Sequence, residues 1–104
     1  MRFLVIERAK VSPTAVDRDQ FAQVALADLE YKRQLERKKK IVAGGPFLDI
    51  LAGGYVLETE TLEELGEILF NSPGNFAMER EVHPLGTFAD SLEGMNELSK
   101  KRRR

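Results

Sequence analysis

An acidic and a basic side chain are four residues apart in the middle of a predicted apolar helix face. Residues 15–38 are rich in helix formers and contain neither glycine nor proline. Asp28 is seven residues from both Phe21 and Leu35, so it projects from near the centre of that face, with Lys32 beside it. A carboxylate partly removed from water and close to an ammonium can carry a proton near neutral pH. The spacing predicts an acid–base site; the alternative is a structural ion pair whose lysine extends outward to solvent.

Three further side chains could contact a substrate beside this pair. Tyr31 flanks Asp28 and Lys32 on the same helix. Arg80, on the last predicted strand, could bind an anionic group such as a carboxylate, or could be a paired arginine in an interface. His83 lies near the end of that strand. It could shuttle a proton or orient a substrate, or simply be a hydrogen-bonded strand-end histidine.

Six helices and strands would have to position these residues. The strands are short apolar or alternating runs, and the second helix opens with the capping-box spacing of Thr61 and Glu64. Residues 12–14 interrupt the chain after the first strand, and the glycine pairs are read as turns, or alternatively as a ligand mouth. The strands are expected at 2–8, 41–43, 55–59 and 76–85, and the helices at 15–38 and 62–69.

This order predicts the fold class. It is a ferredoxin-like βαββαβ pattern, an α+β fold with a four-stranded antiparallel sheet and two helices on one face. We expect this domain to occupy residues 1–86. Residues 87–104 are expected to form a C-terminal helical extension with apolar residues at helical spacing. It ends in a basic tail, which is read as a solvated end rather than a nucleic-acid site.

Composition excludes several classes of function. The chain has 104 residues, a formal net charge of −1, one histidine and no cysteine. Disulfides, thiolate catalysis and cysteine-based zinc sites are therefore excluded, and we predict no metal site. No apolar run approaches the roughly 20 residues that cross a bilayer, and no charge excess favours nucleic acid. The N-terminal stretch does not resemble a signal peptide, so a cytoplasmic location is expected.

The strands also predict self-association. Two helices cover only one face of a four-stranded sheet, yet the first three strands are apolar in both alternating phases. Phe3 and Val5, for example, alternate with Leu4 and Ile6. An exposed apolar face of that size is typical of an interface, and a two-fold homodimer is the commonest way to cover it.

Several segments resemble muconolactone delta-isomerase. Residues 62–73 and 76–85 are similar to the C-terminal half of that family: a Glu-Leu-x-Glu-Leu-Leu-like helix, a proline turn, then an aromatic–Met–acid–x–Glu–Val-like strand. Residues 33–40 resemble the end of the family's first helix, and residues 40–47 are similar to the related YCII-like proteins. The resemblance covers about residues 1–86 and leaves the C-terminal extension unexplained.

The resemblance implies a dimeric α+β barrel, in which two such domains pack sheet to sheet. It implies a cofactor-independent isomerase that moves a proton and a double bond within a small carboxylated lactone or a related enolisable acid. The family's first-helix glutamate is its proposed proton carrier, and counting back from Leu35 places that position on Asp28, which is one methylene shorter. In this hypothesis Asp28 shuttles the proton, Lys32 pairs with it, and Arg80 or His83 meets the anionic part of the substrate.

Two other functions remain open. The first is a non-catalytic YCII-like module for small-molecule binding or oligomeric assembly. It predicts an Asp28–Lys32 pair closed off from solvent, with no adjoining cavity. The second is a cofactorless monooxygenase of the same barrel architecture, for which the sequence offers only Tyr31 and His83. The expected partners in every case are a second copy of the chain and a small molecule, with neither nucleic acid nor a membrane.

Overall fold

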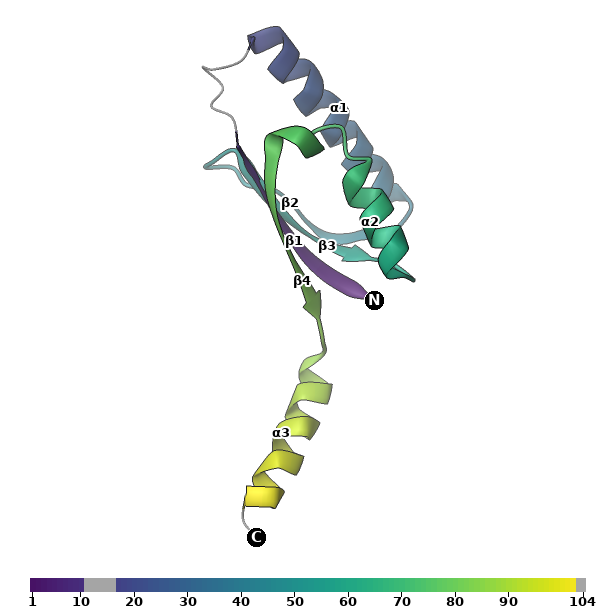
Figure 1. Ribbon diagram of the computed structural model, residues 1–104, viewed down its shortest axis with the longest axis vertical. Helices are drawn as coiled ribbons and strands as arrows, with labels where there is room; N and C mark the ends of the chain where they lie inside the picture. The colour runs from purple at the N-terminus through teal and green to yellow at the C-terminus, as the bar shows by residue number, and fades with distance from the viewer. Residues whose placement is uncertain (11–16, 103–104) are drawn as a thin grey trace.

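The computed structural model describes residues 1–10 and 17–102 and confirms the predicted fold class (Figure 1). It is a ferredoxin-like βαββαβ domain followed by one further helix. The predicted break at 12–14 and the predicted helix start at 15 lie outside the described residues. The elements are β1 (Arg2–Ala9), α1 (Arg18–Arg37), β2 (Ile41–Pro46), β3 (Ala52–Glu58), α2 (Leu62–Phe70), a 3-10 turn (Asn75–Ala77), β4 (Met78–Leu85) and α3 (Phe88–Arg102).

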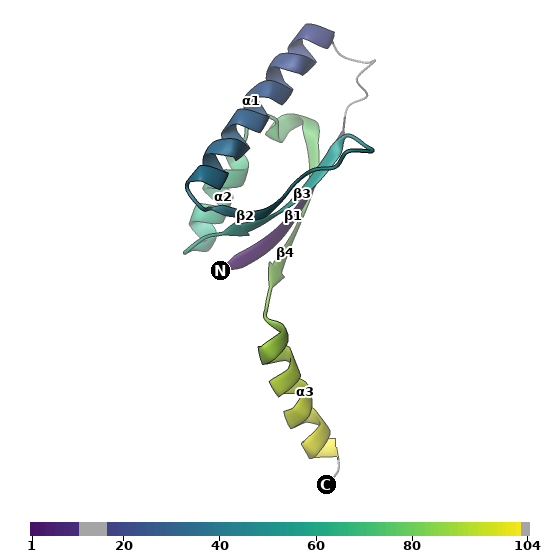
Figure 2. The ribbon, with the colours of Figure 1, turned by 180° about the vertical axis from the view of Figure 1, so that it is seen from behind.

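The four strands form one antiparallel sheet in the order β2-β3-β1-β4. Val5 of β1 is opposite Tyr55 on one side and Val82 on the other, so β1 is central. Helices α1 and α2 lie side by side on the same face of the sheet (Figure 1, Figure 2). Within residues 1–10 and 17–102, no helix covers the opposite face.

The N-terminus of each helix that covers the sheet is capped by the side chain of the residue just before it. The Asp17 carboxylate accepts hydrogen bonds from the backbone N–H groups of Asp19 and Gln20 in the first turn of α1. Lys39 turns the chain after the end of this helix with a φ of 62°. Thr61 accepts from the Glu64 N–H at 3.0 Å, while the Glu64 carboxylate reaches back to the Glu60 N–H, also at 3.0 Å. The predicted pair therefore caps the start of α2, with Glu64 bonding the N–H one residue before the cap and not that of Thr61 itself.

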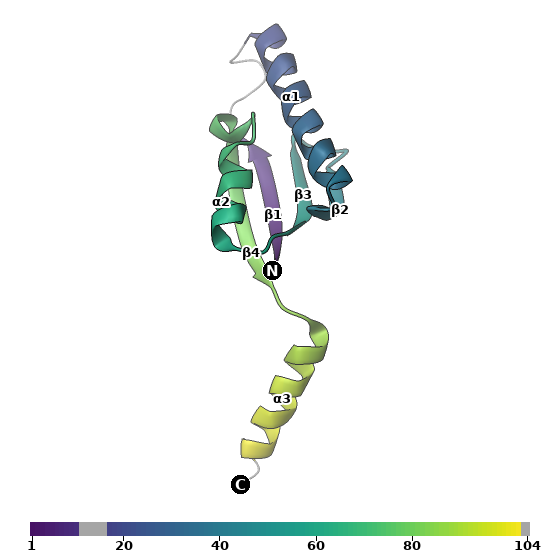
Figure 3. The same ribbon diagram turned by 90° about the vertical axis from the view of Figure 1, so that its right-hand side faces the viewer.

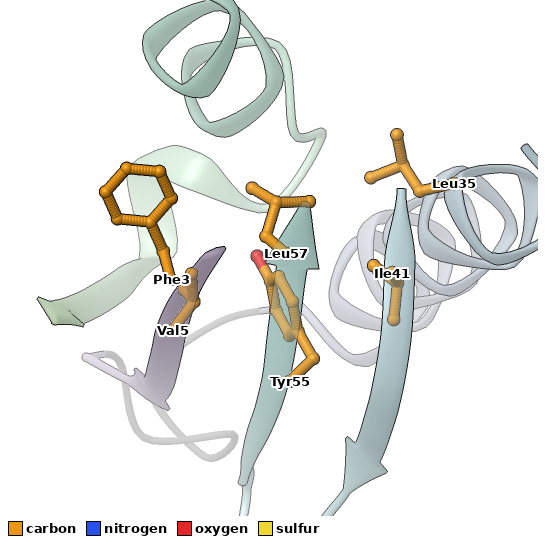
Figure 4. Packing of buried hydrophobic residues seen from close by; sticks show 6 residues of the cluster. All are labelled: Phe3, Val5, Leu35, Ile41, Tyr55 and Leu57. Carbon is orange, nitrogen blue, oxygen red and sulfur yellow. The ribbon is translucent and has the colours of Figure 1, made fainter. Parts of the chain in front are cut away.

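The core lies between the sheet and its helices. Phe3 and Val5 of β1 and Tyr55 and Leu57 of β3 point to the helix side, where Leu35 of α1 meets them (Figure 4). Ile41 of β2 completes the buried cluster. Period-2 alternation along β1 and β3 thus gives the sheet an apolar inner face, against which the amphipathic α1 packs.

The glycine pairs lie in strands, so their interpretation as turns is wrong. The alternative, a ligand mouth, agrees with Gly44, Gly45 and Gly53, which line the cavity described below. Strand β2 runs on through Gly44 and Gly45, and β3 begins before Gly53 and Gly54. Gly45 pairs with Gly54 across the ladder, with an irregular register between residues 41 and 43. The backbone of β3 comes closest at Gly44, where there is no room for a Cβ, so glycine extends this ladder instead of ending it.

Replacing Gly44 with alanine should destabilise the domain by about 2 kcal/mol or more. Gly44 has a φ of 103°, and a Cβ there would lie 2.2 Å from the Gly54 carbonyl oxygen. Gly45→Ala is the matched control, because its Cβ would meet no atom within 4 Å. Its free energy of unfolding should stay within about 0.5 kcal/mol of wild type. Urea denaturation measures both, and equal effects would contradict the argument.

The last strand begins later than predicted, whereas the C-terminal extension is helical, as expected. Phe76 and Ala77 belong to the 3-10 turn, so β4 starts at Met78, two residues later than predicted. Helix α3 then projects away from the sheet, giving extents of 65 × 28 × 22 Å (Figure 3). Within the described residues, no helix is both long and apolar enough to cross a membrane. The apolar stripe of α3 is exposed and comprises Phe88, Leu92, Met95 and Leu98.

Candidate functional site

The predicted pair forms on the inner face of α1. Asp28 is only 8% exposed, and Lys32 Nζ donates a hydrogen bond to its Oδ2 at 2.6 Å. The other carboxylate oxygen, Oδ1, accepts from the Ser72 hydroxyl and from the Gly74 backbone N–H at 3.2 Å. Residues 72–74, which include Pro73, belong to the connection that follows α2. This connection turns toward α1, so that Ser72 and Gly74 reach Asp28. Asp28 is thus a buried carboxylate, and both of its oxygens accept hydrogen bonds.

These donors decide the charge state of Asp28. Burial alone raises the pKa of its carboxyl, but hydrogen bonds from Lys32 and Ser72, together with the positive charge of Lys32, lower the pKa below its usual value. Asp28 is therefore an ionised carboxylate at neutral pH, although burial by itself favours the protonated form.

A second carboxylate joins the pair from the sheet. Glu7 of β1 is 3% exposed and accepts hydrogen bonds from three side chains. Lys32 Nζ donates to Oε1, Arg80 Nε to Oε2 at 2.8 Å, and the Tyr55 hydroxyl to Oε2 at 3.1 Å. Lys32 therefore bridges two buried carboxylates, one on the helix and one on the sheet. Burial, the Glu7 charge and the hydrogen bond to Glu7 keep the Tyr55 pKa well above its ordinary value, so its hydroxyl stays protonated.

A cavity of about 690 Å³ opens beside this cluster, between α1 and the β2–β3 end of the sheet. Asp28, Lys32, Glu7 and Tyr55 all contribute to its wall. A volume of that size suits a small organic molecule. Apolar side chains make up most of the remaining wall, among them Val24, Leu29, Ile41, Phe47, Leu51 and Met78.

The other predicted substrate contacts lie elsewhere. Tyr31 donates its hydroxyl to the Ile68 carbonyl at 2.7 Å, between α1 and α2. Arg80 lies behind Glu7 and also donates to the Asn75 side chain at 2.7 Å. Among the described residues, neither lines the cavity. Tyr31 and Arg80 therefore support the cluster from behind.

His83 is on the opposite side of the sheet from the cluster. It pairs in register with Leu4, in the strand phase that faces away from the helices, and its side chain is 58% exposed. Its hydrogen-bond partner is Glu81, at 3.3 Å. The two-residue alternation of β4 puts Arg80 and His83 on different faces, so the sequence hypothesis that either could meet the same substrate does not fit this chain.

Sequence reasoning missed Glu7 and Tyr55. Both were assigned to strands, but neither was considered as a polar group of the site. The available signal was alternation: Glu7 shares the phase of Phe3 and Val5, and Tyr55 that of Leu57. A carboxylate in the core-facing phase of a strand requires a buried partner. Lys32 is that partner, together with Arg80 from β4.

The lowered pKa of Asp28 predicts a pH-dependent stability difference. A carboxyl whose pKa is lower in the folded state stabilises the fold fully above its unfolded pKa, here an ordinary value of 3.8. That stabilisation is lost as the pH falls through the lower, folded pKa. The stability gap between wild type and Asp28→Asn should therefore narrow as the pH falls below about 3.8. Urea titrations from pH 6 to pH 2 measure the gap, and a constant gap would refute the assignment.

The described residues offer no metal site: nowhere in 1–10 or 17–102 do three or more His, Asp or Glu side chains group closely enough to hold an ion. The polar groups of the site are two carboxylates, an ammonium and a phenol. Such a set can take up, hold and return a proton and can donate a hydrogen bond to a substrate oxygen.

Comparison with known proteins supports the fold. No protein-family model matches the sequence, and no curated protein matches it. A crystal structure of muconolactone isomerase is similar with a TM-score of 0.75 and 23% identity, over 84% of this chain and 90% of that one. The 5-chloro-2-hydroxyhydroquinone dehydrochlorinase of Burkholderia phenoliruptrix AC1100, solved with 2,5-dihydroxybenzoquinone, has a TM-score of 0.64 and 24% identity, over 86% of this chain and 98% of that one. The chain therefore has the α+β fold of muconolactone isomerase.

Proposed function

We propose that this protein is a cofactor-independent enzyme that moves a proton within a small enolisable molecule. The resemblance to muconolactone isomerase suggests a carboxylated lactone as substrate, with a shift of its double bond. One observation carries the proposal: Asp28, an ionised carboxylate, is buried in the wall of an apolar cavity and held by Lys32. A base in such a place can act on a carbon acid that has left water.

In the proposed reaction Asp28 takes a proton from a carbon conjugated to the substrate carbonyl, giving an enolate. The same carboxyl group then returns a proton to another carbon of the conjugated system, so that the double bond moves and no atom is lost. As the proton neutralises Asp28, the positive charge of Lys32 becomes available to the enolate oxygen. An ammonium has three N–H donors, and two of them are bound to Glu7 and Asp28 within the described residues.

The experiment that tests this proposal is proton exchange in heavy water. Purified protein is incubated in D2O with muconolactone and a panel of other small lactones, and NMR follows deuterium entering each compound. Exchange at carbon positions beside the conjugated system, above the rate without protein, is the expected result. Failure to exchange with any member of the panel would remove the enzymatic assignment and leave the fold unaffected.

The cavity counts against the non-catalytic alternative. A YCII-like binding or assembly module predicts an Asp28–Lys32 pair with no adjoining cavity, whereas both residues contribute to the wall of one here. The cofactorless monooxygenase has less support still, since Tyr31 is bonded to a backbone carbonyl and His83 is across the sheet.

We also propose that the chain assembles with a second copy through the helix-free face of the sheet, as in a dimeric α+β barrel. Leu4, Ile6 and Val56 form the apolar centre of that face and remain partly exposed. Two ion pairs flank them, Arg2–Glu58 and Arg8–Glu81. The division at residue 86 and a cytoplasmic location stay predictions.

A further inference from the structure

Both cations that line the cavity are already paired with carboxylates. Lys32 is bound to Glu7 and Asp28 at the buried end, and Arg33 lies 3.4 Å from Glu36 on the exposed side of α1. The charged residues of the wall are thus three acids and two bases. Within the described part of the chain, each cation of the wall is therefore paired with a carboxylate.

Glu7 neutralises the excess positive charge of the buried cluster beside the cavity. Counting formal charges, Lys32 and Arg80 exceed Asp28 by one, and Glu7 brings the total to zero. Its side chain is only 4% exposed, so water screens its charge poorly. Arg80 cannot bind the carboxylate of a ligand, because it contacts Glu7 on the side away from the cavity. Arg80 is not among the described residues that line the cavity.

We propose that Glu7 determines specificity by making the cavity select uncharged enolisable rings over carboxylated ones. The inference rests on the proposed function for proton transfer at Asp28 but departs from the carboxylated lactone that the resemblance suggests, because a free carboxylate on the substrate is disfavoured. A carboxylate entering the buried end would lose its hydration and meet two carboxylates with no unpaired cation. A neutral carbonyl avoids that cost, and its oxygen becomes negative only as Asp28 takes the proton.

A matched pair of ligands tests the inference by binding alone. Muconolactone and its methyl ester differ only in the charge of one group, and benzoate and methyl benzoate repeat the comparison on a planar ring that cannot enolise. Titration followed by protein NMR should give at least about tenfold tighter binding of each ester in the wild type. In Glu7→Gln the ester-to-acid preference should fall by at least about tenfold, mainly because the acids bind more tightly.

Glu30→Gln is the control variant. It changes the net charge by the same amount, but Glu30 is exposed on α1 and does not line the cavity. Its ester-to-acid preference should match the wild type. A preference that fell equally in both variants would mean that net charge, and not Glu7, sets the selectivity.

The ratio of ester to acid affinity in the wild type tests the inference even if Glu7→Gln does not fold. Acids that bind the wild type as tightly as their esters would overturn it, as would the absence of binding by both members of both pairs. An unchanged ratio in a folded Glu7→Gln would overturn the role of Glu7. If muconolactone methyl ester binds in the cavity but neither it nor any lactone of the panel exchanges deuterium, the proposed enzyme is refuted and this selectivity still stands.

Discussion

Asp28→Asn is expected to lower the rate of deuterium exchange by about 10²- to 10⁴-fold, the usual contribution of a positioned base. An amide has nearly the shape of the carboxylate but cannot take up the proton. The fold should survive, because Lys32 keeps its bond to Glu7 and the amide oxygen can still accept from Ser72 and Gly74. The measurement is NMR of deuterium incorporation, with circular dichroism to check folding.

Two further variants distinguish the role of the Asp28 carboxylate from that of the groups around it. Asp28→Glu keeps the carboxylate and should retain part of the exchange, with its rate reduced by altered reach. Ser72→Ala keeps Asp28 itself but removes a hydrogen bond that lowers its pKa, so the acid limb of the pH–rate profile should move to higher pH. Full exchange in a folded Asp28→Asn would eliminate Asp28 as the proton carrier, whatever the two further variants do.

Ile6→Lys is expected to convert the proposed homodimer into a monomer. Ile6 lies at the centre of the helix-free face, beside Leu4 and opposite Gly54 of β3. A lysine from each copy would bring two charges into an apolar interface, where loss of hydration outweighs any local gain. A shift of about tenfold or more in the dimer dissociation constant, measured by analytical ultracentrifugation, is the expected result.

Glu30→Lys is the control for this prediction. Glu30 is exposed on α1, which covers the other side of the sheet, so its replacement should leave the assembly unchanged. Wild-type protein that sediments as a monomer at all accessible concentrations would refute assembly through this face. An Ile6→Lys protein that stays dimeric would move the interface to another surface, for which the exposed stripe of α3 is the next candidate.

Local sequence determined most of the fold. Apolar alternation in β1 and β3, the uninterrupted helical stretch of α1 and the capping box at Thr61 each depend on residues a few positions apart. The order βαββαβ follows from these, and with it the antiparallel sheet. The glycine pairs were misread because glycine is common both in turns and in closely spaced strands. Only the pairing of Gly45 with Gly54 distinguishes the two cases.

The site likewise contains some residues that local sequence predicts and others that only long-range contacts bring together. Asp28 and Lys32 were predictable because they are four residues apart, and the geometry of a helix fixes that neighbourhood. The contacts of Glu7 with Lys32, Tyr55 and Arg80 span 25, 48 and 73 residues along the chain. No local pattern encodes such distances. The sequence by itself therefore determined the Asp28–Lys32 pair. The tertiary structure decided the second carboxylate, the cavity and the position of His83 on the opposite face, because the register of the sheet sets which side chains share a face.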